Sequence, residues 1–516
     1  MEKSAGELEL RSETDDFPLT ESHFAEKTTR TDPIISLLGS DLGPWQLIIC
    51  LWIFLSKFPV GWVQISMVFL QTPLKSTCVT PDNNTDVCAA ECKEVAYDRS
   101  VFQENIISEW NLICERAWLA SLAQSFLMIG IMLGSISFGL LADRWGRRPM
   151  FVGACVMEFV FGCLVSASPW FWLFVLLRFL DGFALGATMS TGFTIIMEIV
   201  GQSKRETMAI LFLIPFNLGH ATLPLFAYYI RHWRWYHLSF SALTVFLLLC
   251  YWTVPESPRW LFTTGRTGRA VQILEAGCKR NKMPTANIRT ELEQAAQLIA
   301  ATPTSQKGNF IDLFRYPYLR RKTLVMTFNW FVTCLVYFGM SQLISQLSGD
   351  IFLNVAISAI LGVPGTLICI PMTRILGRRF TLFLSHFCTS IPLLALAFTP
   401  SLGTTTRMVV ASIGLFAASV SSPNIYLYAG ELFPTVVRNS GMGLCSFVGR
   451  IGSASAPFLS GMSAEAEWIP LTVFGGFSLV AAASLFLVPE TRDLPLPETI
   501  EDGETFGNKS KKVQIS

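Results

Sequence analysis

Long apolar stretches alternate with short polar ones along almost the whole chain. Twelve of them approach the length of about 20 residues that a helix needs to cross a membrane. They form two groups of six, separated by a longer polar segment. The first group lies near 44–70, 117–141, 150–167, 170–196, 207–229 and 237–254. The second group lies near 323–343, 351–373, 380–398, 406–427, 438–460 and 468–488. The pattern predicts an all-α polytopic membrane protein with twelve transmembrane helices.

Three polar motifs occur twice at a nearly constant spacing. Asp-Arg-Trp-Gly-Arg-Arg at 143–148 is followed 231 residues later by Arg-Ile-Leu-Gly-Arg-Arg. Glu198 with Arg205 recurs 233 residues later as Glu431 with Arg438. Val-Pro-Glu-Ser at 254–257 recurs 234 residues later as Val-Pro-Glu-Thr. Such repeats predict two fused, pseudo-symmetric halves, and a site between the halves is typical of a transporter.

Composition supports a membrane protein. The 516 residues are 51% hydrophobic and only 15% charged, whereas an average soluble domain has about a quarter of its residues charged. The net charge of +1 and the lack of a long basic tract give no reason to expect nucleic-acid binding. The predicted division is an N-terminal tail, a first half, a central segment, a second half and a C-terminal tail. These parts cover 1–43, 44–254, 255–322, 323–488 and 489–516.

Basic residues gather in the polar segments on one side of the predicted membrane. Cytoplasmic segments carry the excess of Lys and Arg, so the pattern places both termini in the cytoplasm. Residues 1–43 contain no signal peptide, and we expect the first span to act as the targeting signal. In the central segment, the apolar spacing near 268–274 and 288–299 predicts short amphipathic helices on the inner membrane face.

The polar segment at 71–116 is then outside the cell. Its four cysteines are Cys78, Cys88, Cys92 and Cys114. In an oxidising compartment they are expected to form disulfides, with three possible connectivities, although free thiols are the alternative. Asn83 begins an Asn-Asn-Thr glycosylation acceptor in this segment. No Cys or His spacing typical of a metal site occurs, so we expect neither a metal nor a cofactor.

Several motifs together resemble the major facilitator superfamily and, within it, the organic cation, anion and carnitine transporter family (solute carrier family 22). Besides the run at 143–148, they are Glu-Trp-Asn-Leu-Ile-Cys at 109–114, Trp-Arg-Trp at 233–235, Pro-Glu-Ser-Pro-Arg-Trp-Leu at 255–261, Asn-Trp-Phe at 329–331 and Glu-Leu-Phe-Pro-Thr-Val-Val-Arg at 431–438. Sugar porters share the run at 255–261. The resemblance implies the major facilitator fold and transport by alternating access.

The charged residues of the repeated motifs are expected at the cytoplasmic ends of helices. There, carboxylates favour helix N-termini, and guanidiniums favour carboxylates or C-termini. We predict ion pairs across the two halves that hold an inner gate shut. Alternatively, the arginines only set the topology. The residues are Asp143, Arg144, Arg147, Arg148, Glu198, Arg205, Glu256, Arg259, Arg378, Arg379, Glu431 and Arg438.

Ionisable residues also lie deep within the predicted spans. Each costs about 2.5–3.5 kcal/mol on insertion scales, so such residues usually face a cavity or a partner. They are Lys57, Glu158, Arg178, Asp181, His220 and Arg450. Arg178 and Asp181 are three residues apart on one helix face, and we predict that they pair locally. The alternative for these two residues is a direct part in transport.

Small residues flank Arg450, which leaves room for its guanidinium to bind a carboxylate or sulfate. Family members that carry organic anions or carnitine-like zwitterions resemble this chain in having Arg there, whereas cation carriers have an acidic residue. The chain departs from both groups in the eighth span: Thr366 stands where anion carriers tend to have Lys, and Gly362 where carnitine-type carriers tend to have Glu. With Arg450 and Lys57 for a carboxylate and Glu158 for an amine, a zwitterionic substrate is as plausible as a plain anion. Alternatively, Lys57 pairs with Glu158.

Two aromatic residues of the seventh span lie two turns apart on one face. Trp330 and Tyr337 could line a central cavity and stack on a ligand. The resemblance favours Tyr337, because the family tends to keep an aromatic residue there. Trp330 could equally be a core residue, and His220 could bind a ligand or bond a neighbouring helix.

The leading hypothesis is therefore a plasma-membrane carrier of small organic anions or zwitterions. No nucleotide-binding loop occurs, so the driving force is a substrate gradient, exchange or a coupled ion. The alternatives are an organic cation carrier, a sugar porter and a transport-dead receptor on the same fold. An enzyme is not expected, because no Ser/His/Asp or metal-ligand constellation lies in the spans.

Overall fold

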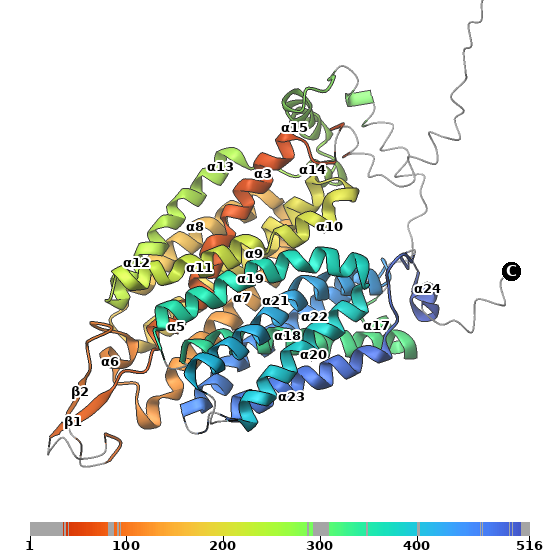
Figure 1. The fold of residues 1–516 in the computed structure, drawn as a ribbon. Helices are drawn as coiled ribbons and strands as arrows, with labels where there is room; N and C mark the ends of the chain where they lie inside the picture. Colours follow the sequence, from red (N-terminus) through yellow and green to blue (C-terminus); the bar gives the residue numbers. More distant parts are fainter. Residues whose placement is uncertain are drawn as a thin grey trace, which may run out of the picture.

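The chain folds into two bundles of long helices that lie side by side (Figure 1). The computed structural model describes residues 35, 38–39, 41–80, 87–89, 92, 94–285, 288–290, 292, 309–346, 349–399, 403–464, 466, 468–494, 496–497 and 499–506. The predicted glycosylation site at Asn83 and most of the second amphipathic helix predicted at 288–299 lie outside these residues.

The first bundle contains the first six predicted spans. The first span is divided into α3 (Pro44–Leu55), α4 (Lys57–Ile65) and α5 (Met67–Leu70). The next three are α7 (Trp118–Trp145), α8 (Arg147–Ser166) and α9 (Phe171–Ile199). The fifth span consists of α10 (Gln202–Leu211) and α11 (Ile214–Tyr229). The sixth consists of α12 (Trp233–Leu243), the 3-10 helix η2 (Thr244–Leu249) and α13 (Cys250–Thr253).

The second bundle contains the other six. They are α18 (Pro317–Gln346), α19 (Ile351–Ile375), α20 (Arg378–Phe398), α21 (Thr404–Leu432), α22 (Arg438–Gly461) and α23 (Trp468–Ser484), with short 3-10 helices η3 (Met462–Ala464) and η4 (Leu485–Leu487) on either side of α23. Several helices extend beyond their apolar windows, as where α18 begins at Pro317 instead of 323. The additional turns contain charged residues, which an apolar window does not include.

Within the described residues, eleven helices are long and apolar enough to cross a membrane. The remaining predicted span, the eleventh in chain order, forms α22, which does not reach that hydropathy. Its 24 residues contain Arg450 and many Gly and Ser residues, and it packs against α18 and α7. Because protein surrounds much of α22, its low hydropathy is compatible with a place inside the bundle.

Two serines interrupt the helix of the first span. Ser56 donates its hydroxyl to Ile53 O at 2.7 Å, and Ser66 donates to Val63 O at 2.9 Å. Serine competes with the backbone in this way and bends helices. Between the two breaks, α4 packs tightly on α11, since a Cβ on Gly61 would lie 2.4 Å from Phe216 O.

Four glycines bring α7 and α9 into backbone contact. A Cβ on Gly134 would lie 1.9 Å from Phe183 O, and a Cβ on Gly186 would lie 2.1 Å from Ile131 O. Gly130 and Gly182 repeat this arrangement one turn away. Small residues allow close helix contact where lipid leaves no hydrophobic drive for association. The two helices therefore pack as one unit.

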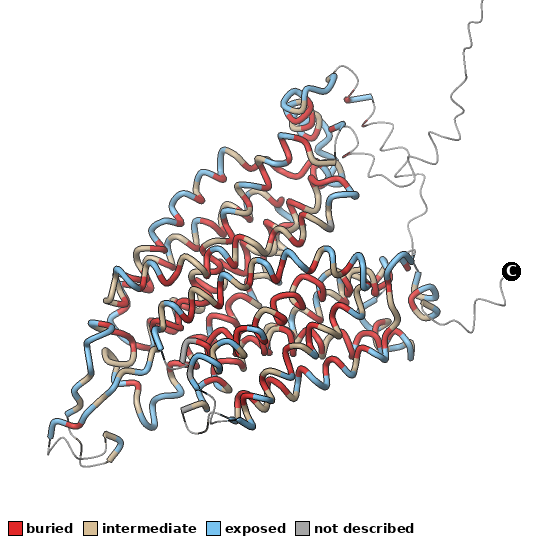
Figure 2. The backbone as a smooth tube through the Cα atoms, viewed as in Figure 1, coloured by how far each residue is buried: buried red, intermediate tan, exposed pale blue. Residues whose placement is uncertain are grey.

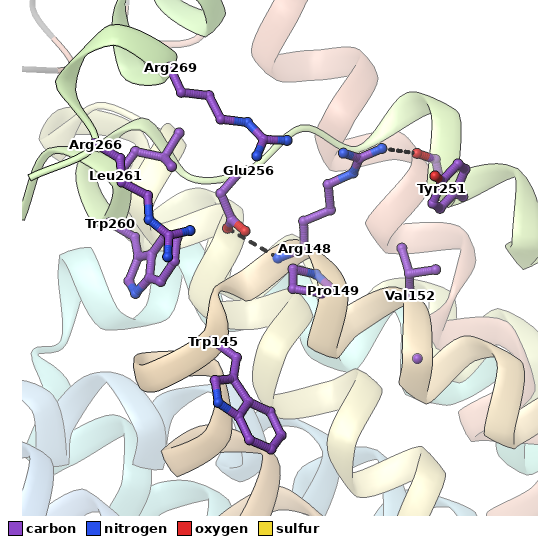
Figure 3. Close-up of a pocket in the computed structure, with 11 residues that line it drawn as sticks. Trp145, Arg148, Pro149, Val152, Tyr251, Glu256, Trp260, Leu261, Arg266 and Arg269 are labelled. Carbon is purple, nitrogen blue, oxygen red and sulfur yellow. Dashed lines mark hydrogen bonds between the residues drawn. The ribbon is translucent and has the colours of Figure 1, made fainter. Parts of the chain in front are cut away.

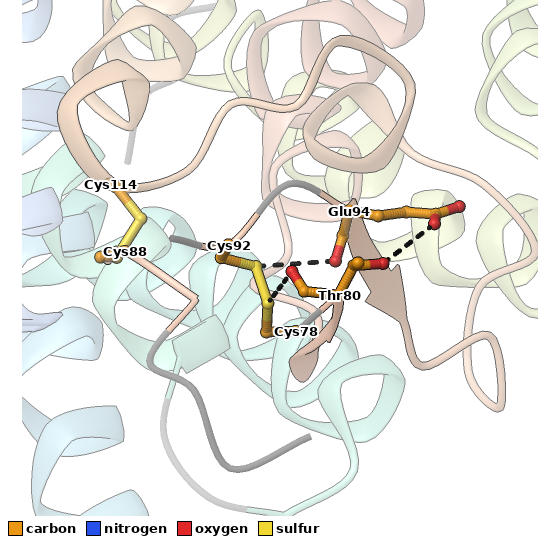
Figure 4. Close-up of a disulfide and its surroundings, with 6 residues drawn as sticks. All are labelled: Cys78, Thr80, Cys88, Cys92, Glu94 and Cys114. Carbon is orange, nitrogen blue, oxygen red and sulfur yellow. Dashed lines mark hydrogen bonds between the residues drawn. A yellow bond between two sulfur atoms is a disulfide. The ribbon is translucent and has the colours of Figure 1, made fainter. Parts of the chain in front are cut away.

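A small sheet and two disulfides organise the segment at 71–116. Strand β1 (Ser76–Thr80) pairs antiparallel with β2 (Glu94–Tyr97). Of the three possible connectivities, the structure has Cys78–Cys92 and Cys88–Cys114 (Figure 4). We call this end of the molecule the loop end, and the opposite end, where 143–148 and 374–379 lie, the motif end.

The segment is attached to the first bundle through Glu109. This residue lies in α6 (Ile106–Trp110), ahead of the 3-10 helix η1 (Cys114–Arg116). Its carboxylate forms an ion pair with Arg234 and accepts the indole N–H of Trp233 at 2.5 Å. The neighbouring Trp110 packs its ring against Trp233 with centroids 5.4 Å apart. The Glu-Trp-Asn and Trp-Arg-Trp motifs therefore form one junction.

The central segment forms short helices at the motif end. They are α14 (Pro258–Thr263), α15 (Thr267–Arg280) and α17 (Asp312–Arg315), and α24 (Ile500–Thr505) follows the last span. In α15 the buried residues Ala270, Leu274, Gly277 and Cys278 share one face, as the apolar spacing predicts. Trp45 N–H donates to Asn281 Oδ1 at 3.0 Å, which joins the end of α15 to α3.

The apolar core is continuous between the bundles at the loop end and divided at the motif end. One cluster joins residues of both halves, such as Phe69 of the first and Phe352 of the second, whose rings stack 5.7 Å apart. At the motif end each cluster contains residues of one half only. Buried residues follow the inner faces of both bundles (Figure 2). The halves are thus packed together most closely at the loop end.

We expect Gly134→Ala to lower the free energy of unfolding by about 1–3 kcal/mol, because the methyl group overlaps the Phe183 carbonyl and forces α7 and α9 apart. Thermal unfolding of the purified protein in detergent measures the change. Gly139→Ala on the same helix is the matched control, since its Cβ meets only Ser190 Oγ, at 3.5 Å. Equal losses in the two variants would contradict the glycine contact.

Candidate functional site

A carboxylate caps the N-terminus of α8 at the motif end. Glu256 Oε1 accepts the backbone N–H groups of Arg147 at 2.8 Å, Arg148 at 3.1 Å and Ser257 at 3.0 Å. A negative charge is favoured there by the unsatisfied N–H groups and the helix dipole. Gly146 has φ +110°, and a Cβ there would lie 2.4 Å from Glu256 Oε2. The glycine of the motif therefore makes room for this carboxylate.

The Arg147 side chain connects three segments of the first half. Its guanidinium bonds both carboxylate oxygens of Glu198 on α9, at 3.0–3.2 Å, and Asp143 on α7 at 2.9 Å. It also donates to Ala142 O at 2.7 Å. Planar, bidentate pairing of this kind suits Arg and is stronger than a neutral hydrogen bond.

The second half repeats these contacts. Glu490 accepts the N–H groups of Arg378 at 2.8 Å and Arg379 at 3.1 Å. The Arg378 guanidinium bonds both oxygens of Glu431 at 3.0–3.1 Å. Gly377, with φ +88°, takes the place of Gly146. The repeated motifs thus build the same arrangement at the end of each bundle.

Another pair of equivalent arginines bonds the backbone. Arg205 Nε donates to Val200 O at 3.0 Å, and Arg438 Nε donates to Phe433 O at 3.2 Å. Each closes the turn after its long helix, α9 or α21. Arg144 and Arg259, also expected in the network, are exposed.

The pairs shown for Arg147 and Arg378 lie within one half, whereas the sequence led us to expect pairs across the halves. The reason is geometric, because each motif turn directs its guanidinium back to the long helix of its own bundle. Glu490 was missing from our sequence-based set, although the repeat of Val-Pro-Glu at 488–490 identifies it as the partner of Glu256. Pairing between the halves remains a prediction for another state of the protein.

Lys57 lies close enough to charged residues of two other helices to interact with them. The Lys57 ammonium interacts electrostatically with Glu158 on α8 and with Arg450 on α22. Lys57 is 3% exposed and lies 4.1 Å above the ring of Phe212. Among the described residues its ammonium has no ion pair, so the alternative that Lys57 pairs directly with Glu158 is wrong for this structure.

Glu158 and Arg450 also form no ion pair among the described residues. Glu158 is 1% exposed, and neither carboxylate oxygen has a hydrogen-bond partner among the described residues. The Arg450 guanidinium is half-buried and makes no hydrogen bond within the described chain. Its neighbours are Tyr426 and Cys334. Unpaired buried charges are costly, so groups of this kind usually serve a ligand or a proton.

The predicted ion pair between Arg178 and Asp181 does not form. Arg178 donates to Gln124 Oε1 at 2.8 Å and Ser66 Oγ at 3.0 Å, whereas the Asp181 oxygens have no partner in the described part of the chain. Helical side chains lean toward the N-terminus of the helix. A basic residue that precedes an acidic one on a helix also forms a weaker ion pair than the reverse sequence order. Arg178 therefore extends away from Asp181, toward the first span and α7.

Tyr337 takes part in a hydrogen-bonded link between the halves. Its hydroxyl donates to Asn217 Oδ1 at 3.1 Å, and Asn217 Nδ2 donates to Thr366 Oγ1 at 3.1 Å. A Cβ on Gly362 would lie 2.8 Å from Asn217 Oδ1. Asn217 is a polar residue within the fifth span, and that is the only sequence signal that could have indicated it.

The remaining candidates are buried side chains. Trp330 is 1% exposed and packs on Tyr426, with ring centroids 4.6 Å apart. It also lies directly against Gly449. It therefore belongs to the core beside Arg450. His220 is 1% exposed, and its Nε2 has no hydrogen-bond partner among the residues described. No group of three or more His, Cys, Asp or Glu side chains in the described chain could hold a metal ion.

Comparison with known proteins places this architecture in a family. The profile of the Major Facilitator Superfamily matches residues 117–457. The chain belongs to this superfamily. It is 36% identical, over 81% of its length and 77% of the relative's, to an organic cation transporter protein of Drosophila melanogaster. It is 34% identical to mouse solute carrier family 22 member 3, over 80% of this chain and 75% of that protein. The chain is thus a transporter of the solute carrier family 22 type.

The chain is also similar to a second Drosophila transporter and to a solved structure. A β-alanine transporter of Drosophila melanogaster is 34% identical over 79% of this chain and 68% of its own. The solved structure of the proton:xylose symporter XylE superposes with a TM-score of 0.64, covering 90% of this chain and 99% of that one. Its identity of 17% means that this likeness concerns the fold alone.

We expect Arg147→Lys to lower the free energy of unfolding by about 2 kcal/mol, because Lys cannot form the two parallel bonds to Glu198. Thermal unfolding in detergent measures the loss. Arg144→Lys in the same motif is the control and should stay within about 0.5 kcal/mol, since that side chain is exposed. If both variants were equally destabilised, the bonds of Arg147 would not account for the effect.

Proposed function

We propose that this chain carries small zwitterionic solutes, such as short amino acids, across the plasma membrane. The observation behind the proposal is the group of Lys57, Glu158 and Arg450 in the middle of the molecule, where charges of both signs are buried without partners. A ligand with one carboxylate and one amine would neutralise charges of both signs at once.

The zwitterion would be oriented by the two halves. Arg450, on α22 of the second half, is suited to bind the carboxylate through two parallel bonds. Glu158, on α8 of the first half, would accept the amine. Because the ligand would then contact both bundles, it would be held between the parts that move against each other in alternating access.

The eighth span supports a substrate different from those of typical anion or carnitine carriers. At the two positions where those carriers tend to have Lys or Glu, this chain has Thr366 and Gly362. Both contact Asn217, and a larger residue at Gly362 would collide with that amide. We propose that the neutral link from Tyr337 through Asn217 to Thr366 lines the site instead of a charge.

The similarity to the β-alanine transporter supports a zwitterion, since β-alanine carries both an amine and a carboxylate. The names of the other relatives favour a second candidate, a plain organic cation, which Glu158 could bind. Arg450 and Lys57 oppose that candidate by repulsion. A plain anion, open on sequence grounds, is now the weakest of the three because it leaves Glu158 unpaired.

The apolar contacts between the halves gather at the loop end. We propose that this arrangement is the state open toward the cytoplasm, with the motif end inside as the positive-inside rule predicts. The arginine–carboxylate groups at the ends of the bundles then keep each half rigid while the halves move. A substrate gradient, an exchange partner or a coupled ion would drive the cycle.

The proposal is tested by uptake of isotope-labelled β-alanine, tetraethylammonium and benzoate into cells that express the chain. We expect saturable uptake of β-alanine. Arg450→Gln and Glu158→Gln should each reduce it at least about tenfold, because each removes a charge-assisted hydrogen bond. Surface labelling corrects for the amount of protein in the plasma membrane.

Arg280→Gln removes the same charge from the exposed end of α15 and is the control for Arg450→Gln. Uptake of tetraethylammonium that survives Arg450→Gln and is lost in Glu158→Gln would establish the cation carrier instead. Uptake of benzoate that survives Glu158→Gln would refute both candidates.

A further inference from the structure

A cavity lies at the motif end of the first half (Figure 3). It has a volume of about 460 Å³. Its walls come from the ends of α7 and α8, from α13 and from the segment leading into α15. It is therefore distinct from the central group of Lys57, Glu158 and Arg450.

Three arginines and one glutamate line this cavity, and the arginines come from two segments. Arg148 lies in the first turn of α8, Arg266 precedes α15 and Arg269 lies in the first turn of α15. Figure 3 shows Arg269 reaching toward the space between Arg148 and Glu256. Bringing like charges together is unfavourable unless an anion lies among them.

Glu256 is the one carboxylate among the lining residues, so the three arginines leave the cavity with an excess of positive charge. Glu256 Oε1 already accepts three backbone N–H groups, those of Arg147, Arg148 and Ser257. Arg148 donates to a carbonyl, Tyr251 O, at 2.5 Å. In the part of the chain that the structure describes, none of Arg148, Arg266 and Arg269 has a side-chain ion pair with a carboxylate.

Aromatic rings orient two of these guanidiniums. Arg148 lies over the ring of Tyr251 at 5.1 Å, and Arg266 lies over that of Trp260 at 5.3 Å. Stacking on a ring leaves the N–H groups at the edge of a guanidinium available to an anion. Planar arginines held in this way recognise phosphate well.

The cavity continues into an apolar surface along α8. Its lining includes Val152 and Gly153, and a Cβ on Gly153 would meet no atom within 4 Å. Val156, Val160 and Leu164 follow at helical spacing and are 43%, 42% and 44% exposed. A basic cavity joined to an exposed apolar stripe matches a lipid with an anionic headgroup.

The second half has the same helix cap, but Ile500 and Gly503 stand at the spacing from Glu490 that Arg266 and Arg269 have from Glu256. Arg379, the equivalent of Arg148, lies over Phe486 at 5.3 Å. The segment after Glu490 is acidic where the first half has Arg266 and Arg269, with residues such as Glu501 and Glu504. The two extra arginines are therefore not needed to cap the helix.

We infer that this cavity binds a phosphorylated phospholipid, with the phosphates among Arg148, Arg266 and Arg269 and the acyl chains along α8. The inner leaflet, where anionic lipids concentrate, faces the motif end in the predicted orientation. The inference does not depend on which solute the protein carries, because it concerns a different site.

The experiment measures binding of dioctanoyl phosphatidylinositol 4,5-bisphosphate to the purified full-length protein in neutral detergent. Arg266→Ala/Arg269→Ala should bind at least about tenfold more weakly, since each basic residue near an anionic lipid contributes to the affinity. Arg280→Ala, on the same helix α15, should bind like the unaltered protein. Dioctanoyl phosphatidylcholine should not bind measurably.

Two further measurements separate the sources of the effect. Both arginines are exposed, so the double variant should unfold at the same temperature as the unaltered protein without lipid, and Arg266→Lys/Arg269→Lys should keep most of the affinity. Inositol 1,4,5-trisphosphate, which lacks acyl chains, should bind at least tenfold more weakly than the lipid. Equal affinity for this soluble phosphate, or unchanged lipid binding in the alanine variant, would overturn the inference.

Discussion

Each half of the molecule depends on one carboxylate held at the start of a helix. The first N–H groups of a helix have no partner within it, and leaving a buried one unpaired is costly. Glu256 satisfies two of them in α8, and Glu490 does the same in α20. With the turn held in this way, Arg147 and Arg378 are directed toward Glu198 and Glu431. One acid therefore organises the ends of several spans.

Charges at the ends of the bundles and charges in the middle play different parts. At the motif end, arginines and carboxylates satisfy one another with bidentate geometry. In the middle, Lys57 interacts at a distance with Glu158 and with Arg450, and the described residues give no hydrogen bond among the three. Satisfied pairs hold a structure together, whereas unsatisfied buried charges are retained for some other reason. This contrast locates the candidate transport site better than burial alone.

The long helices, the two halves and the family could be predicted because hydropathy and repeats are local signals. The partner of Arg178 could not be predicted. Its side chain leans toward the N-terminus of its helix and reaches Gln124, which is 54 residues away in the sequence. Asn217 was also missed, since one amide in an apolar span has no periodicity. The pairing of Cys78 with Cys92 depends on how β1 and β2 align, and the cysteine spacing alone does not define that alignment.

The two breaks in the first span have a mechanical consequence. A continuous helix resists bending because each bend stretches a ladder of hydrogen bonds along its whole convex side. At Ser56 and Ser66 the side-chain hydroxyls bond the carbonyls three residues back. The span therefore consists of three helical segments, and we expect it to bend most easily at Ser56 and Ser66. Lys57 lies directly after one of these breaks, so rotation about Ser56 would swing its ammonium relative to α8 and α22 while α7 and α9 stay locked together.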